Sequence, residues 1–230
     1  MYVLHYAPDN ASQIIRIVLE EMGLPYRTAL VDRATKAQDS AAYRAVNPTG
    51  LIPALQTPQG TLFETGAILL WLTEVHGQMA PPPGTHGRGD FLKWLFFTAN
   101  TLHSDARLLF YPEAHAGSPQ AIPAFRSTTE ARILRHLDLL NSLAAAAPTF
   151  LRGDTPSVLG YYICCLIRWI TLYPADRYGW LDLTRFPALH ALALALESRP
   201  ATMRVAVAEG LGPTIFTAPT YADPPEGSAL

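Results

Sequence analysis

The stretch of residues 47–72 constrains the fold more than any other part of the chain. It reads NPTGLIPALQTPQGTLFETGAILLWL. It opens with four turn-forming residues, continues as a short apolar segment, reverses at Pro-Gln-Gly and returns as a second short segment. The residues after Glu64-Thr65-Gly66 are apolar almost without interruption, which is typical of a helix covered on more than one side. The pattern therefore predicts a turn, a strand, a tight turn, a strand and a helix.

Three positions in this stretch suggest binding as well as packing. Glu64 and Thr65 stand at the predicted helix N-terminus, where free N–H groups and the helix dipole attract an anion and a hydroxyl can cap or bind. The Glu64 carboxylate favours an ammonium group, so a free amino-acid head would suit both residues. Pro53 stands at the start of a strand, and a cis bond there would turn the backbone of Ile52 outward. The alternative is that Thr65 only caps the helix and Pro53 only begins the strand.

These residues together resemble a known motif. The order N-P-x-G-x-(V/I)-P-x-L, followed about ten residues later by (F)-E-(S/T)-x-A-I-x-x-(W/Y)-L, is similar to the glutathione-binding half of the cytosolic glutathione S-transferases of bacterial type. The resemblance implies that Pro53 is cis, that the backbone of Ile52 pairs with the cysteinyl part of glutathione, and that Glu64 and Thr65 hold its γ-glutamyl head. It also implies glutathione as the co-substrate and a homodimer.

The resemblance predicts an α/β thioredoxin-like N-terminal domain followed by an all-α helical C-terminal domain. Apolar periodicity before the central stretch agrees with the first of these and predicts a strand at 2–6, a helix at 14–22, a strand at 26–31 and a helix at 41–46. We expect this domain to cover residues 1–78.

The rest of the chain reads as helical. A Pro- and Gly-rich segment at 79–88 predicts an interdomain linker, and residues 89–213 predict the helical substrate domain. Its expected helices cover 90–110, 121–146, 158–171, 187–196 and 201–208. Ser157 is expected to cap the third of these, where Gly160 stands in place of the Asp usual in the family. The tail 214–230 has no apolar period and predicts an irregular segment, wrapped over the surface or crossing the mouth of the cleft.

The loop before the first helix is where the resemblance places the chemistry. In this family a Tyr, Ser or Cys in that loop stabilises the glutathione thiolate, but the bacterial cysteine position falls on Ala11, which excludes a cysteine mechanism. The remaining candidates are the Asn10 amide, the Ser12 hydroxyl, the Tyr6 hydroxyl and backbone N–H groups. Asn10 and Ser12 could instead cap the helix, and Tyr6 could belong to the core. Asp9 would repel a thiolate and is a poor candidate.

Two further sets of residues are candidates for binding. The resemblance implies a basic residue that meets the glycine carboxylate of glutathione, and Arg33 or Lys36 could supply it, although both lie in a polar loop that could simply be solvated. The side chains expected near the family's hydrophobic-substrate site all lie on the helix predicted at 90–110. They are Phe96, Asn100, His103, Arg107 and Tyr111. The alternative is helix packing for Phe96 and Tyr111 and a structural role for His103.

Composition excludes several other classes of function. The formal net charge of -2 gives no basic surface for nucleic acid, and no apolar run is long enough for a membrane span. The two cysteines, Cys164 and Cys165, are adjacent, point about 100° apart on a helix and cannot form a disulfide with one another. Their small number fits a reducing, cytoplasmic location. No metal-ligand spacing, phosphate loop or C-x-x-C pair occurs in the sequence.

The sequence therefore predicts a glutathione transferase that joins the thiolate of glutathione to a small hydrophobic electrophile. Two alternatives remain at this point. One is glutathione-dependent reduction of peroxides or disulfides, and the other is a weakly catalytic ligand-binding protein on the same fold.

Overall fold

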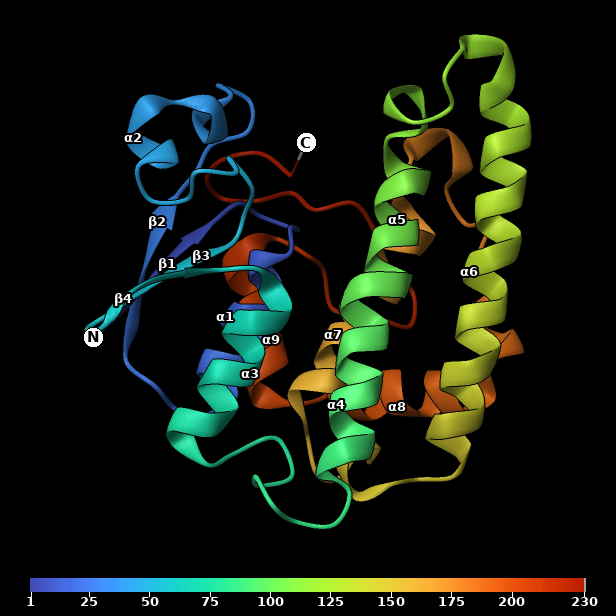
Figure 1. Cartoon of the computed structure of the whole chain (residues 1–230). Helices are drawn as coiled ribbons and strands as arrows, with labels where there is room; N and C mark the ends of the chain where they lie inside the picture. Colours follow the sequence, from blue (N-terminus) through green and yellow to red (C-terminus); the bar gives the residue numbers. More distant parts are fainter. Residues whose placement is uncertain (230) are drawn as a thin grey trace.

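The N-terminal domain is a mixed β-sheet with helices packed against it. A computed structural model of the chain describes residues 1–229. The sheet has the order β2-β1-β3-β4, with β1 parallel to β2 and antiparallel to β3, and β3 antiparallel to β4. Figure 1 shows the sheet on one side of the molecule and the helical domain on the other. The elements in chain order are β1 (Tyr2–Tyr6), α1 (Ser12–Glu21), β2 (Tyr26–Leu30), α2 (Ala41–Arg44), β3 (Ala54–Thr57), β4 (Gly60–Phe63) and α3 (Thr65–His76).

The predicted thioredoxin-like order of elements is confirmed. The hairpin pairs Ala54 with Phe63 and Thr57 with Gly60, which leaves Pro58 and Gln59 as the tight turn. Pro53 lies directly before β3, and the Ile52–Pro53 bond is cis, as the resemblance implied.

The second half of the chain is helical, as predicted. Its helices are α4 (Arg88–Phe97), α5 (His103–Phe110), α6 (Ile122–Ala145), α7 (Val158–Leu172), α8 (Pro187–Glu197) and α9 (Pro200–Glu209). The helix predicted at 90–110 is divided in two by a π-helical turn, Thr98–Leu102. A π turn holds one more residue than an α turn. The side chains before it therefore point in a different direction, relative to those after it, than they would in a continuous α-helix. None of the helices in residues 1–229 is long and apolar enough to cross a membrane.

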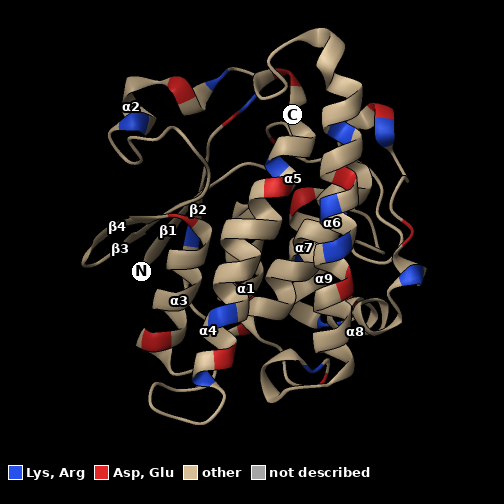
Figure 2. Ribbon diagram, turned by 45° about the vertical axis from the view of Figure 1, so that its right-hand side comes forward, with Lys and Arg blue, Asp and Glu red and all other residues tan. Residues whose placement is uncertain are grey.

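Helix α7 is the centre of the molecule. Every residue of α7 except Thr171 is buried, and it packs against α1, α3, α4, α5 and α8. Helix α1 in turn packs against both α7 and α9, which joins the sheet domain to the helical domain. Charged residues of both signs lie along α6 on the outside (Figure 2). The core therefore forms around α7, and α6 contributes a solvated outer face.

The N-terminus of α7 is capped as the sequence predicted. The Gly160 N–H donates to Ser157 Oγ over 3.1 Å, and that hydroxyl donates to the Phe150 carbonyl over 2.6 Å. A Cβ at Gly160 would lie 3.1 Å from Leu196 Cδ1, a tight contact with α8. The glycine at this position thus allows the close approach of α7 and α8.

The C-terminal tail, described to residue 229, contains no helix or strand and returns to the sheet domain. It leaves α9 at Gly210, whose φ of 64° and whose closeness to the Asp223 carbonyl leave no room for a side chain. The Asp223 N–H donates to the Gly210 carbonyl over 2.8 Å. Further on, Glu226 accepts a hydrogen bond from the Tyr6 hydroxyl. Figure 1 shows the end of the tail between the sheet domain and α5.

We predict that Ser157→Ala destabilises the protein by about 1–2 kcal/mol, because it removes the cap of α7 and a buried hydrogen bond. Urea denaturation measures the change. Ser142→Ala is the matched control, since the exposed Ser142 hydroxyl bonds only the Asp138 carbonyl of its own helix, and we expect a change within about 0.5 kcal/mol. Equal effects of the two substitutions would contradict a capping role for Ser157.

Candidate functional site

A cavity of 450 Å³ lies between the sheet domain and the helices α5 and α7. Its volume is within the range usual for small-molecule sites. Its walls are formed by the loop before α1, the loop before β3, the N-terminus of α3, both helices and the end of the tail. Of the residues predicted from the sequence, it is lined by Asn10, Arg33, Ile52, Pro53, Glu64, Thr65, His103, Arg107 and Tyr111.

The N-terminus of α3 opens into this cavity. Glu64, the residue before the helix, has φ 69° and ψ 113°, a conformation that side-chain-bearing residues rarely adopt. The Thr65 hydroxyl makes no hydrogen bond with any residue in 1–229, and neither does the Glu64 carboxylate, which is exposed. A ligand at this point can therefore contact the Thr65 hydroxyl, the Glu64 carboxylate and the N-terminus of α3. The backbone of Glu64 is strained at the same point.

The loop before β3 presents backbone groups to the same cavity. The Leu51 carbonyl accepts from the Tyr43 hydroxyl and from Asn47 Nδ2, each over 2.7 Å, and these contacts hold the loop in place. The N–H and C=O of Ile52 have no hydrogen-bond partner within the described chain. An extended peptide could pair with this edge.

Asn10 is the polar side chain of the α1 loop that faces the cavity. Its Oδ1 accepts from the Ala11 N–H over 2.8 Å. With Oδ1 engaged, Nδ2 is the amide atom that remains as a donor, and no residue in 1–229 accepts from it. The neighbouring Ala11 also lines the cavity. A negatively charged atom placed there would meet the Asn10 amide.

Two other candidates from this region, Ser12 and Tyr6, do not line the cavity, which corrects their expected place at the site. Ser12 is fully buried; its hydroxyl donates to the Ala7 carbonyl over 3.0 Å and accepts from the Ala7 N–H over 3.3 Å. Its one proton is therefore already used. Tyr6 is buried in β1 and donates to Glu226 of the tail, and burial raises the pKa of its phenol.

Of the two basic candidates, only Arg33 lines the cavity. Its Nη1 donates to the Ala229 carbonyl over 2.6 Å, and its Nη2 donates to the Tyr111 hydroxyl over 3.2 Å. Ala229 lines the cavity as well, so the tail forms part of the wall. Lys36 is exposed outside the cavity, in a left-handed backbone conformation. Of the two, the structure therefore places Arg33 at the cavity wall and Lys36 away from it.

The helical wall of the site differs in part from the prediction. His103, Arg107 and Tyr111 line the cavity, whereas Phe96 and Asn100 are exposed elsewhere. The π-helical turn explains this correction, because it lies between Phe96 and His103 and changes the helical phase. Three aromatic side chains that the sequence analysis did not select complete this wall. They are Phe110, Trp169 and Tyr173.

His103 is a neutral member of this wall. Its Nδ1 lies 2.8 Å from the Tyr162 hydroxyl, and its ring is largely enclosed by α7. Burial, helped by the nearby charge of Arg107, lowers the pKa of His103 to about 4. The imidazole is therefore uncharged at neutral pH.

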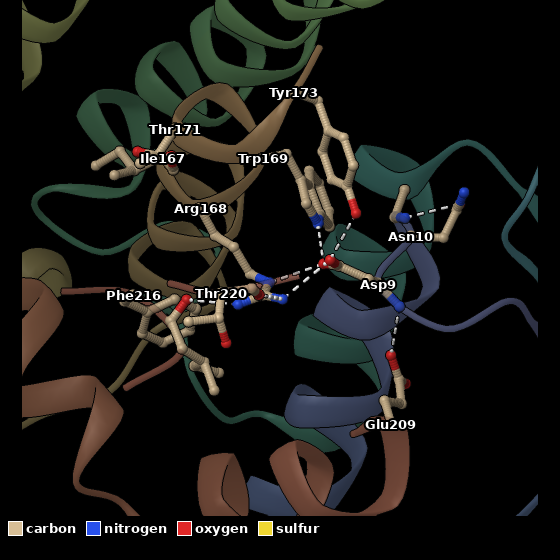
Figure 3. A network of polar contacts seen from close by, with 12 residues as sticks. Asp9, Asn10, Ile167, Arg168, Trp169, Thr171, Tyr173, Glu209, Phe216 and Thr220 are labelled. Carbon is tan, nitrogen blue, oxygen red and sulfur yellow. Dashed lines mark hydrogen bonds and ion pairs between the residues drawn. The ribbon is translucent and has the colours of Figure 1, made fainter. Parts of the chain in front are cut away.

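Asp9, which the sequence analysis set aside, is the most heavily hydrogen-bonded residue of the loop. Its carboxylate accepts from Arg168 Nε at 2.8 Å and Nη2 at 2.9 Å, from Trp169 Nε1 at 2.8 Å and from the Tyr173 hydroxyl at 3.0 Å. Figure 3 shows these three side chains converging on it from α7 and the residue that follows α7, while Asn10 points away. The side chains of Asp9 and Arg168 are both fully buried. Their charges cancel, so the carboxylate does not leave a free negative charge at the cavity.

The backbone of Asp9 is held from the other side. Asp9 adopts φ 49°, and its N–H donates to Glu209 Oε2 over 3.0 Å. Glu209 is fully buried and pairs with Arg16 Nη1 at 3.3 Å. Burial raises the pKa of the Glu209 carboxyl to about 7, and the charge of Arg16 opposes this rise. The loop that carries Asn10 is thus fixed by helices α7 and α9 together. Arg168, the one charged residue within the apolar run 158–172, was the sequence signal for this network.

The two cysteines take no part in the site. Cys164 and Cys165 are fully buried in α7, and burial raises the pKa of both thiols. Within residues 1–229, no group of three or more His, Cys, Asp or Glu side chains is placed to hold a metal ion.

Comparison with known proteins gives a consistent result. Residues 10–75 match the family model of the N-terminal domain of glutathione S-transferase. The chain is 29% identical over 219 residues to the disulfide-bond oxidoreductase YfcG of Escherichia coli, covering 92% of this chain and 97% of that protein. It is 27% identical over 212 residues to the glutathione S-transferase GstA of Escherichia coli, covering 90% and 98%. A glutathione transferase structure from Methylococcus capsulatus is similar with a TM-score of 0.73 and 30% identity, covering 91% of this chain and 99% of that one.

We predict that Asp9→Asn and Arg168→Met each destabilise the protein by about 3–5 kcal/mol, because each leaves one buried charge without its partner. The double variant should cost clearly less than the sum of the two, since it leaves no unpaired charge. Urea denaturation measures all three.

The exposed pair Arg44–Asp39, at 2.9 Å, provides the control. Asp39→Asn removes the same kind of group at the surface and should change stability by at most about 1 kcal/mol. Strict additivity of the two buried substitutions would contradict a direct interaction between Asp9 and Arg168.

Proposed function

The chain belongs to the glutathione S-transferase family, and on this basis we propose that it joins the thiolate of glutathione to a small hydrophobic electrophile. The observation that supports the proposal best is the meeting of the α3 N-terminus and the Asn10 amide in one cavity. Each of these groups has hydrogen-bonding capacity that the protein itself does not use. The homodimer that the sequence implied stays a prediction.

The free groups of the cavity match the parts of glutathione. The γ-glutamyl head has an ammonium group for Glu64 and a carboxylate for the Thr65 hydroxyl and the N–H groups of α3. The cysteinyl part is an extended peptide unit for the backbone of Ile52. The glycine carboxylate would pair with Arg33, in exchange for the hydrogen bond that Arg33 now makes to the tail.

The chemical role that the chain must fill is stabilisation of a thiolate. Lowering a thiol pKa from about 8.5 to about 6.5 requires roughly 2.7 kcal/mol of preferential interaction with the charged form. We assign this role to the Asn10 amide, with the adjacent backbone N–H groups at the start of α1. The aromatic wall of Phe110, Trp169 and Tyr173 would hold the electrophile and exclude water. The new bond forms between sulfur and the electrophilic carbon, the leaving group departs with the electron pair of the broken bond, and the thiol proton passes to solvent.

Glutathione-dependent disulfide reduction is the second candidate. It is supported by the similarity to YfcG, which is named a disulfide-bond oxidoreductase. Both cysteines of this chain are buried and protonated, so thiols of glutathione would have to supply the electrons. Turnover of a chloronitrobenzene compared with turnover of a small disulfide separates the two activities.

We predict that Thr65→Ala and Glu64→Gln each weaken glutathione binding by about 1.5–3 kcal/mol, because each removes a hydrogen bond to a charged group. Isothermal titration calorimetry on the folded variants measures this. Glu113→Gln, an exposed carboxylate outside the cavity, is the control and should bind as the wild type does. Unchanged affinity in both site variants would refute the assignment of the γ-glutamyl site.

We predict that Asn10→Ala raises the thiol pKa of bound glutathione by about one unit, because it removes one charge-assisted hydrogen bond to the thiolate. Thiolate absorbance followed against pH measures it. The chemical rate should fall while affinity changes little, because the head of glutathione is held elsewhere. Asn100→Ala, an exposed amide outside the cavity, is the matched control. A wild-type thiol pKa in Asn10→Ala would assign the role to backbone N–H groups instead.

A further inference from the structure

Arg107 is a cation that faces the cavity without a partner. It is exposed on α5, lines the cavity, and its side chain makes no hydrogen bond or ion pair with any residue in 1–229. Glu64, which also lacks a partner within residues 1–229, is negative, and the other charged groups of the cavity wall are engaged. Asp9 is neutralised by Arg168, and Arg33 donates to Ala229 and Tyr111. Arg107 is therefore the positive charge that the protein leaves available to a ligand.

Glutathione does not use this charge. This step rests on the proposed function, in which Glu64 meets the ammonium group of glutathione, the α3 N-terminus meets one carboxylate and Arg33 meets the other. With the thiolate assigned to the Asn10 amide, the charged groups of the tripeptide are then all matched, and Arg107 is left over. A guanidinium binds a carboxylate most favourably through two parallel hydrogen bonds. The second substrate is the remaining source of such a group.

The surroundings of Arg107 indicate what the rest of that substrate is like. Phe110 follows three residues later on the same helix, Tyr111 comes directly after that helix, and Trp169 and Tyr173 contribute from the α7 side. These rings offer flat apolar surfaces that suit a planar molecule. His103, one turn before Arg107, is neutral at neutral pH and adds no second cation.

We propose that Arg107 determines substrate specificity by binding a carboxylate of the electrophile, so that the protein prefers planar aromatic or conjugated acids. Arg107 does not take part in the bond-making step. It orients the acid so that the electrophilic carbon lies toward Asn10 and the aromatic wall covers the ring. The second half of a glutathione disulfide also carries carboxylates, and the experiment below distinguishes this source from an acidic electrophile.

The first test measures turnover with a matched pair of substrates, 4-chloro-3,5-dinitrobenzoate and its methyl ester. In both, glutathione sulfur replaces chloride at the ring carbon, and the carboxyl group is unchanged. Each kcat/KM is divided by the uncatalysed rate constant, which removes the difference in intrinsic reactivity. We expect the acid-to-ester ratio to fall about tenfold in Arg107→Gln, mainly through KM for the acid. Arg107→Lys should recover part of the ratio. Arg135→Gln, an exposed cation on α6 outside the cavity, should leave it unchanged.

The second test does not require turnover. Calorimetry compares binding of unreactive 3,5-dinitrobenzoate and 3,5-dinitrobenzamide to the wild type and to Arg107→Gln. Stronger binding of the acid by the wild type, lost in the variant, supports the inference even if no conjugation occurs, in which case the proposed function alone fails. Equal binding of acid and amide by the wild type would overturn the inference. A loss in Arg107→Gln confined to reduction of glutathione disulfide would overturn it too, since the carboxylate would then belong to a second glutathione.

Discussion

The buried pair of Asp9 and Arg168 connects the parts of the molecule that make the site. Both side chains are removed from water, so each charge is tolerable only beside the other. Arg168 also donates to the carbonyls of Ile215 and Thr220, over 3.2 and 2.9 Å, which attaches the tail to the same pair. The α1 loop, the central helix and the tail are therefore fixed by one guanidinium. Movement of any one of them would leave a buried charge without its full set of hydrogen bonds.

This arrangement also determines the electrostatics of the cavity. A carboxylate next to the position of a thiolate would ordinarily oppose ionisation of the thiol. Here four donors from α7 and Tyr173 satisfy the Asp9 carboxylate, and the protein uses it to hold the loop. The charges that remain facing the cavity are those of Glu64, Arg33 and Arg107, together with the positive end of the α3 dipole. Their balance favours a ligand with more negative than positive charge.

The features that the sequence predicted are those encoded by neighbouring residues. The hairpin, the cis Pro53 and the cap at Ser157 depend on spacings of a few residues, and the central stretch carries most of them. The errors concern long-range contacts. Asp9 and Arg168 are 159 positions apart, and Tyr6 meets a tail residue 220 positions away. Local patterns cannot reveal such partners. Phe96 and Asn100 were misplaced for a different reason, because the apolar pattern of residues 90–110 does not reveal the π-helical turn.

The absence of a cysteine in the α1 loop changes how a thiolate would have to be stabilised. Ala11 has no side-chain donor, its N–H already donates to Asn10 Oδ1, and the Ser12 hydroxyl is committed to Ala7. Stabilisation then depends on donors whose position is set by backbone geometry, namely the Asn10 amide and the N–H groups beside it. Such donors are effective only when they are held in place before the charge develops, because reorienting them costs free energy that offsets their interaction with the thiolate. The hydrogen bonds that fix Asp9 on both its backbone and its side chain provide that rigidity directly beside Asn10. The loop can therefore present a neutral amide as a thiolate donor, which a flexible loop of the same sequence could not do.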